Sequence, residues 1–468
     1  MKAHRTVKSK EIPKRINIFK PKDPNRVLKI GVWIYFFLWI FEGALRKWVV
    51  PQLSMPLLVV RDPIVLWLII AAAKRGLLKS NIYFTGMICL GIFSLFAAIF
   101  MGHGDVSTAI YGARTMILYF SMIFVIGSVF NREDIIKLGK ATLWIAIPMT
   151  FLLVLQFYSP QSAWVNRGVG GDENGAGFGG ALGYFRPPGT FSFTNGTTCF
   201  YSLLAPFLIY FWLNSKGINR TLLIAATAAL VIAIPISISR ALFLQVAVCI
   251  VFLLVAISRN PKYFSKVLLA TALVIVALAL FSNVEFFNTA TSAFTSRFEN
   301  ANEIEGGLVE GVLGNRFFGA LIKGLTSSES LFGYGVGSGT ALGAQLLNYT
   351  KIIETADFEW MREVAEMGAM GLILIALRVG LALKLTLASF RKLKNDDMLP
   401  WILTSVGAVI VTQGQWHQPT SLGFCALIGG IWLASFRYKR VTKPIKKKKK
   451  NPSTADLSGS TPAAEAIG

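Results

Sequence analysis

The chain has few residues of the kinds that hold metal ions or form disulfides. It contains four cysteines and three histidines among 468 residues. The cysteines, at positions 89, 199, 249 and 425, all lie in apolar segments and show no CxxC spacing, which argues against a structural disulfide or a zinc site. Three histidines are too few for a histidine-rich metal site. We therefore expect neither a metal ion nor another cofactor.

Charged residues are also scarce. They make up 15% of the chain, whereas 54% of the residues are hydrophobic and the mean hydropathy is +0.56. This composition excludes an ordinary soluble globule and is typical of a protein that crosses a membrane many times. The net charge of +23 is concentrated in segment 2–29, in short loops and in the run 446–450. That placement indicates membrane orientation and anionic lipid headgroups rather than a nucleic-acid partner.

Apolar runs of about 20 residues are long enough to cross a bilayer. The first such run has no small-residue cleavage site after it, so we expect a retained helix rather than a signal peptide. The sequence predicts an all-α polytopic membrane protein with about twelve transmembrane helices and a large external loop domain before the tenth. The approximate segments are 28–43, 55–73, 82–101, 112–130, 138–158, 197–213, 220–237, 240–257, 265–282, 367–387, 399–413 and 419–436.

The basic loops favour one orientation. Loops 74–81, 131–140, 214–220, 258–266 and 388–398 and both tails carry Lys or Arg, and twelve spans put all of them on one side. The positive-inside rule makes that side the cytoplasm. We therefore expect a multi-pass protein of the bacterial inner (cytoplasmic) membrane with both termini cytoplasmic. The predicted parts are a basic cytoplasmic tail (1–27), helices 1–5 (28–158), an external loop (159–196), helices 6–9 (197–282), a large external loop or cap (283–366), helices 10–12 (367–436) and a basic disordered cytoplasmic tail (437–468).

Several arginines lie in or at the edge of segments that this topology puts outside, among them Arg167, Arg186, Arg240, Arg297 and Arg316. A guanidinium group fits phosphate or carboxylate oxygens bidentately, so these exceptions predict an anionic ligand at the outer face. Arg240 stands between two apolar runs, at the membrane boundary. It is either an interfacial anchor or a phosphate ligand that faces a cavity in the bundle.

Three further segments are candidates for the site. Segment 331–339 has glycine at every second position, which allows a backbone anion-binding nest or simply a flexible turn. Segment 184–195 contains a Pro-Pro-Gly turn that presents Arg186 beside aromatic rings suited to sugar faces, or that only closes the outer face. Helical spacing puts Glu359, Arg362, Glu363 and Glu366 on one face, either as a solvated salt-bridged helix start or as the source of a general base.

In this order, on a chain of about twelve spans, these segments resemble the O-antigen polymerase and O-antigen ligase superfamily (Wzy-type and WaaL-type membrane proteins). The resemblance covers about residues 180–375. It implies chemistry on undecaprenyl-pyrophosphate-linked sugars at the periplasmic face, with Arg240 and Arg316 binding the pyrophosphate. The residues that carry it are Arg186-Pro-Pro-Gly-Thr-Phe, Ser239-Arg240, Arg316, Leu331-Phe-Gly-Tyr-Gly-Val-Gly and Glu366-Met-Gly-Ala-Met-Gly.

One departure from the family concerns the general base. Many members, especially ligases, have a His-Asn pair before the tenth span, where this chain has Asp357-Phe358 and then Trp360 at the aromatic position. We therefore expect Asp357 or Glu359 to accept the proton. His417, beside Trp416 on the outer face, is either an interfacial belt position or a substrate contact. The predicted substrate-binding residues are Arg186, Arg240, Arg316, Tyr334, Trp360 and His417, and the predicted catalytic residues are Asp357, Glu359, Arg240 and Arg316.

The resemblance implies an exopolysaccharide or O-antigen polymerase that joins lipid-linked repeat units by metal-independent, inverting glycosyl transfer. Its partners would be the undecaprenyl-pyrophosphate-linked glycan, membrane lipid and other assembly proteins such as a chain-length regulator. One alternative is a ligase that passes the glycan to another acceptor, against which the missing histidine argues. Others are a transporter of polysaccharide or lipid-linked sugar, and a non-catalytic subunit of an export complex. The absence of an internal repeat argues against the transporter.

Overall fold

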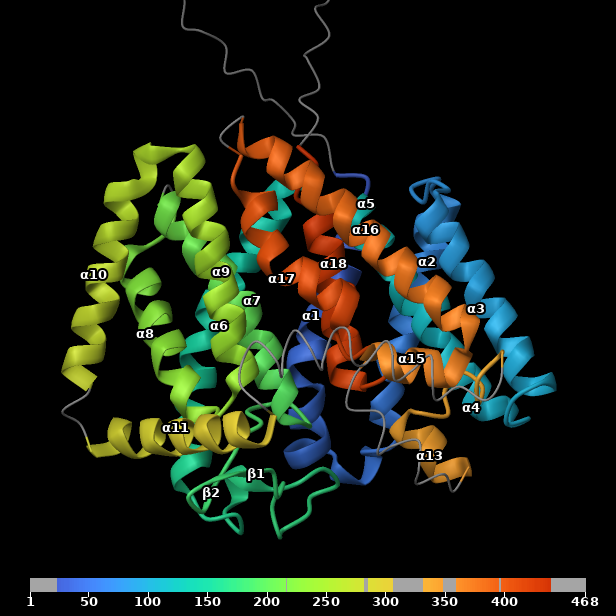
Figure 1. The fold of residues 1–468 in the computed structure, drawn as a ribbon, viewed down its shortest axis with the longest axis horizontal. Coiled ribbons are helices and arrows are strands. Elements are labelled where there is room, and N and C mark those ends of the chain that lie inside the picture. Colours follow the sequence, from blue (N-terminus) through green and yellow to red (C-terminus); the bar gives the residue numbers. More distant parts are fainter. Residues whose placement is uncertain are drawn as a thin grey trace, which may run out of the picture.

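A computed structural model describes residues 23–215, 217–281, 285–305, 331–347, 359–394 and 397–438. These residues form a helical bundle, with a two-stranded hairpin at one end (Figure 1). Among them, eight helical stretches are long and apolar enough to cross a membrane by length and composition, and three further apolar helices are shorter. The described chain therefore has the architecture of an all-α membrane protein. The number of twelve spans stays a prediction.

Each of the twelve predicted segments overlaps a helix. Two differ noticeably from expectation. The second begins late, because residues before Asp62 form the short 3-10 turns η2 (Pro51–Leu53) and η3 (Pro56–Val59), and the fourth contains a π-helical stretch, η4 (Thr115–Phe120). The helices are α1 (Arg26–Ala44), α2 (Asp62–Lys74), α3 (Ile82–Phe100), α4 (Val106–Arg114) continued by α5 (Ser121–Val129), α6 (Arg132–Tyr158), α7 (Thr194–Leu213), α8 (Arg220–Ile236), α9 (Arg240–Arg259), α10 (Phe264–Phe281), α16 (Ala369–Leu393), α17 (Leu399–Gln413) and α18 (Pro419–Ala434).

Several of the loops predicted to be cytoplasmic meet at one end of the bundle, at the top of Figure 1. Lys29 of α1 pairs with Asp134 of α6 at 2.6 Å, and Arg132 pairs with Asp397 before α17. Tyr438, after α18, donates to the same Asp397. Both ends of the described chain are therefore on the same side of the bundle, which we call the basic end.

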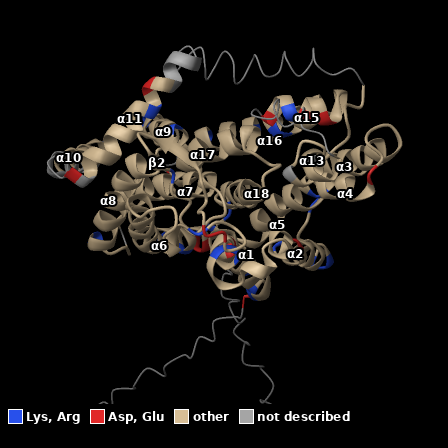
Figure 2. Ribbon diagram, turned by 90° about the horizontal axis from the view of Figure 1, so that it is seen from below, with Lys and Arg blue, Asp and Glu red and all other residues tan. Residues whose placement is uncertain are grey.

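The opposite end, called the hairpin end, carries the elements that are not predicted spans. The hairpin pairs β1 (Gly179–Ala181) with β2 (Tyr184–Phe185) in antiparallel fashion. Three further helices lie toward this end: α11 (Glu285–Glu305), which contacts β1, and, on the other side of the bundle, α13 (Ala341–Leu347) and α15 (Glu359–Met367). In Figure 1, α11 crosses in front of the ends of α8 and α9, and Figure 2 shows acidic and basic residues together on α15. These helices and the loop 331–340 are the described parts of the predicted cap, 283–366.

The end of α1 holds the Pro-Pro-Gly loop. After Ala44 the chain continues as a π-helical turn, η1 (Leu45–Val49), which directs two buried cations into that loop. Lys47 Nζ donates to the Gly189 carbonyl at 2.6 Å, and Arg46 Nη1 donates to Ser192 Oγ at 2.9 Å. Basic residues at the end of the first span thus position a loop from a distant part of the sequence.

The charges that weaken the second predicted span are paired inside the bundle. Arg61 Nε lies 3.0 Å from the Glu42 carboxylate, and Arg114 Nη1 lies 2.5 Å from the Asp62 carboxylate. Arg61 also donates to the Pro419 carbonyl at 2.5 Å, where α18 begins. Ionisable residues in an apolar bundle are tolerated when they pair in this way.

The last helix, α18, lies at the centre of the bundle and most of its residues are buried. It is joined to the first helix by two long-range hydrogen bonds. Tyr35 Oη donates to the Gly423 carbonyl at 2.8 Å, and Trp39 Nε1 donates to the Thr420 carbonyl at 3.0 Å. The two ends of the sequence thus form one core.

Candidate functional site

Three arginines from three different elements converge at the hairpin end: Arg186 after β2, Arg240 at the start of α9 and Arg297 on α11. The pKa of Arg186 is lowered to about 10, first because the guanidinium is buried and second because Arg297 and Arg240 repel its charge. Burial and Arg240 likewise lower the pKa of Arg297. The Nε atom of Arg186 is buried without a hydrogen-bond partner. An anion would relieve this repulsion, so we treat these three residues, the arginine cluster, as an anion site.

Local structure fixes two members of the arginine cluster. Arg297 Nη1 donates to the carbonyls of Gly179 and Gly180, at 3.0 Å each, and so holds α11 against the hairpin. Ser239 caps α9, because its Oγ accepts a backbone N–H of the first turn at 3.2 Å, and this sets the position of Arg240. The partial positive charge at the start of a helix favours an anion as well.

A histidine and a glutamate form a second constellation. His417 Nδ1 lies 2.9 Å from Glu359 Oε2, and the Trp416 backbone N–H donates to Glu359 Oε1 at 3.1 Å. Burial alone would raise the pKa of Glu359, but Arg362, His417 and Arg378 outweigh it and lower the pKa, so the carboxylate stays ionised. An ionised partner at Nδ1 favours the tautomer in which Nε2 accepts a proton. The side chain of His417 is 18% exposed, so the ring is accessible.

The first turn of α7 connects the two constellations. Thr198 Oγ1 lies 2.9 Å from Ser239 Oγ, beside the arginine cluster. Asn195 Nδ2 donates to Gln415 Oε1 at 2.9 Å and also to Gln418, on either side of His417 in the sequence. Residues three apart on a helix are neighbours, about 5–6 Å between Cβ atoms. Sequence neighbours of Arg240 and of His417 therefore bond to the same part of α7, Ser239 to Thr198 and Gln415 to Asn195.

The predicted acidic face of α15 is a buried ion network. Arg362 donates to Glu359 and to Glu366, at 2.7 Å each. Arg378 of α16 pairs with Glu363 and lies 3.6 Å from Glu359. The shared face is confirmed, but the interpretation as a solvated helix start is wrong, because all four α15 residues are buried. With an exposed fraction of 3%, Glu359 contacts His417 rather than the outside.

The glycine-alternating loop wraps around one of these carboxylates. The N–H groups of Gly337 and Gly339 donate to Glu366 at 3.1 and 2.8 Å. Gly335 and Gly337 have φ values of +103° and +94°, a backbone region that favours glycine. An anion-binding nest therefore forms as predicted, but the anion it holds is a side chain of the same protein.

Because this network is buried, breaking it should destabilise the protein. We expect Glu366→Gln to lower the free energy of unfolding by about 3–5 kcal/mol, since the buried Arg362 then keeps only Glu359, a carboxylate that Arg378 and His417 also contact. The measurement is thermal unfolding in detergent. The matched control is Glu173→Gln, which removes an exposed partner of Arg167 at the surface and should leave the melting temperature unchanged. Equal melting temperatures for both variants would contradict this account.

The other predicted site residues have varied positions. Tyr334 is 43% exposed on the glycine loop, and Trp360 Nε1 donates to the backbone of α17 at 2.8 Å. Trp416 is completely buried, so it is not an interfacial belt residue. Arg316 and Asp357 lie outside the described residues.

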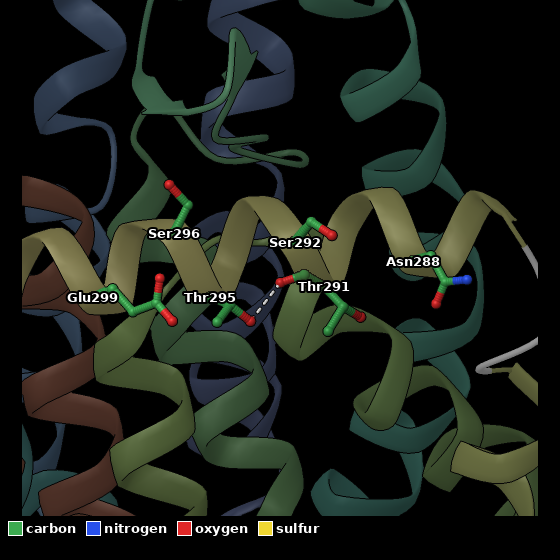
Figure 3. Close-up of a pocket in the computed structure, with 6 residues that line it drawn as sticks. All are labelled: Asn288, Thr291, Ser292, Thr295, Ser296 and Glu299. Atoms are coloured by element: carbon green, nitrogen blue, oxygen red, sulfur yellow. Dashed lines mark hydrogen bonds between the residues drawn. The ribbon is translucent and has the colours of Figure 1, made fainter.

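A polar depression of about 390 Å³ lies on α11 (Figure 3). It is wide open, and a single helix supplies its lining, so we treat the arginine cluster rather than this depression as the candidate site. The lining residues are Asn288, Thr291, Ser292, Thr295, Ser296 and Glu299.

Within the described ranges, no three His, Cys, Asp or Glu side chains come together in a way that could hold a metal ion. Comparison of the chain with protein-family models, with curated proteins and with solved structures finds no match. The function must therefore be inferred from the residues themselves.

Proposed function

We propose that this protein is a membrane glycosyltransferase that joins undecaprenyl-pyrophosphate-linked oligosaccharides, like the exopolysaccharide and O-antigen polymerases that its sequence resembles. The observation that carries the proposal is the presence of two constellations, the arginine cluster and the His417–Glu359 pair, whose neighbours Ser239 and Gln415 bond to the same part of α7. A cationic site and an oriented base are the two requirements of a transfer reaction in which the leaving group is a pyrophosphate.

In the proposed reaction the arginine cluster binds the pyrophosphate of the donor. The hydroxyl oxygen of the acceptor sugar attacks the anomeric carbon, and the bond from that carbon to the pyrophosphate oxygen breaks. The lipid pyrophosphate leaves with the bonding electrons, and the arginines stabilise its charge. His417 Nε2 takes the hydroxyl proton, and Glu359 stabilises the resulting imidazolium. Direct displacement inverts the configuration at the anomeric carbon.

This assignment changes the expected base. The sequence favours Asp357 or Glu359, whereas the contacts favour His417 as the base and Glu359 as the residue that orients it. A histidine base also weakens the sequence argument against a ligase, because that argument relied on the missing histidine of the large loop. A ligase that passes the glycan to a different acceptor is thus the second candidate.

The proposed orientation has the hairpin end at the periplasmic face of the bacterial inner membrane. The basic loops at the opposite end support it, because positive residues stay on the cytoplasmic side. The donor then approaches from the outer leaflet, where its lipid remains in the bilayer.

Incubating the purified, reconstituted protein with lipid-linked repeat units tests the proposal. Longer lipid-linked glycans are the expected result. Transfer only to an added lipid-core acceptor would show a ligase, and movement of the units across the membrane without new bonds would show a transporter. No change in length, acceptor or sidedness would contradict the proposal.

Binding of an anion to the arginine cluster should weaken at high pH. Only the protonated guanidinium attracts an anion, and the pKa of Arg186 is lowered to about 10. The affinity for inorganic pyrophosphate should therefore be constant at neutral pH and fall as the pH rises through about 10. Titration calorimetry measures it, and Arg186→Gln should remove most of this decline. If the affinity of Arg186→Gln declined in the same way, deprotonation of groups other than Arg186 would be responsible.

A further inference from the structure

Four uncharged polar residues form a cluster beside His417: Asn195 on α7, Gln415 and Gln418 before α18, and Ser421 in its first turn. Asn195 Nδ2 lies 2.9 Å from Gln415 Oε1, 2.9 Å from Ser421 Oγ and also within hydrogen-bond distance of Gln418. An amide nitrogen has only two hydrogens, so three acceptors exceed what it can satisfy. We call this group the carboxamide cluster.

Three buried polar atoms in this region have no hydrogen-bond partner, Trp416 Nε1 and two carboxamide atoms. The Oδ1 atom of Asn195 is buried and accepts no hydrogen bond, and the Nε2 atom of Gln413, at the end of α17, is buried and donates none. Buried polar atoms are nearly always hydrogen-bonded in folded proteins, so such exceptions need an explanation. Gln415 is exposed, so the carboxamide cluster reaches the surface. A polar ligand with both hydrogen-bond donors and acceptors would supply partners for these unpaired atoms.

We propose that the carboxamide cluster is the acceptor subsite and binds the hydroxyl groups of an uncharged sugar whose free hydroxyl is deprotonated at His417. This inference rests on the proposed transfer function and adds the class of acceptor. Carboxamides both donate and accept, as sugar hydroxyls do, and the cluster carries no charge to pair with an acidic sugar.

The arrangement separates the two substrates. The acceptor binds at Asn195 and at Gln415, which is two residues before His417, while the arginine cluster holds the donor near Thr198. Asn195 and Thr198 are neighbours on α7, so one rigid element brings the attacking hydroxyl and the leaving group together.

The test measures donor and acceptor kinetics separately. The donor is the lipid-linked repeat unit, and the acceptor is the soluble, labelled oligosaccharide released from the same lipid-linked glycans by mild acid. We expect Asn195→Ala and Gln415→Ala each to raise the acceptor KM by about fivefold to tenfold, the size of a lost uncharged hydrogen bond. The donor KM should stay within twofold of wild type.

The control variant is Asn214→Ala, at the opposite end of α7, which should change neither KM. An increase in the acceptor KM for Asn214→Ala as large as that for Asn195→Ala would show that the effect comes from disturbing α7 and would overturn the inference.

Other outcomes separate this inference from the proposed function. If the wild-type protein transfers glycan but Asn195→Ala and Gln415→Ala leave the acceptor KM unchanged, or raise both KM values equally, only the acceptor subsite is wrong. If the wild type transfers nothing, the proposed function is wrong, and the subsite with it. Should Asn195→Ala fail to fold, Gln415→Ala still decides, because that residue is exposed.

Discussion

Replacing His417 with alanine should lower kcat for glycan transfer by about 10²–10⁴-fold, the usual contribution of a positioned general base. The donor KM should stay near its wild-type value, because the arginine cluster that binds the pyrophosphate is untouched. The loss follows from the contact with Glu359, which holds the ring by Nδ1 and leaves Nε2 to take the proton. The measurement is the rate of glycan elongation by the reconstituted protein.

His103 provides the matched control. Its Nε2 atom contacts the Val336 carbonyl at 3.2 Å, away from Glu359, so His103→Ala should leave kcat within a few-fold of wild type. Added imidazole should partly restore His417→Ala, because a small base can replace the missing ring. If His417→Ala kept its wild-type kcat, the proton would have to go elsewhere, and Asp357 would be the next candidate.

Replacing Arg240 with alanine should lower kcat/KM by about 10²–10³-fold, the effect of removing one preorganised donor from a developing negative charge. Arg240→Lys should also be impaired, because an ammonium group cannot form the planar, bidentate hydrogen bonds by which a guanidinium binds two oxygens. The double variant with Arg186→Ala should lose less than the two single losses combined, since residues that act as a unit are not additive.

Arg167→Ala is the matched control for the arginine series. Arg167 lies on the same predicted outer face but pairs with Glu173 at 2.8 Å on the surface. The Arg167→Ala variant should therefore elongate glycans at the wild-type rate. Polymer of normal length from Arg240→Ala, in a protein that inserts at the wild-type level, would show that the arginine cluster does not bind the leaving group.

The helices could be predicted because apolar runs are a local property of the sequence. Each predicted span overlaps a helix, although segment 55–73 begins with 3-10 turns and becomes α-helical only at Asp62. The sequence could not show how the charges at Arg61 and Asp62 are accommodated. Their partners, Glu42 and Arg114, are in other helices, and only tertiary packing reveals the pairing.

The site could be predicted only in part. Arg186 and Arg240 stand out because arginine is rare outside the cytoplasmic loops, but Arg297 gains a role only through its neighbours in space. The pairing of His417 with Glu359 joins residues 58 positions apart, and no periodicity encodes such a contact. One signal could have indicated this pairing. His417 lies on the same predicted outer face as the acidic segment 359–366, and the large external loop contains no histidine.

The central position of α18 has a consequence for biogenesis. Tyr35, Trp39 and Arg61 belong to the first spans to be synthesised, yet their partners are backbone carbonyls of residues 419–423, close to the end of the chain. Until the ribosome has released the last span, these donors have no such acceptors, and an unpaired polar group in a bilayer is costly. The nascent protein must therefore wait for its final helix before its first helices reach their native packing. A chain that stops before Pro419 would lack these bonds.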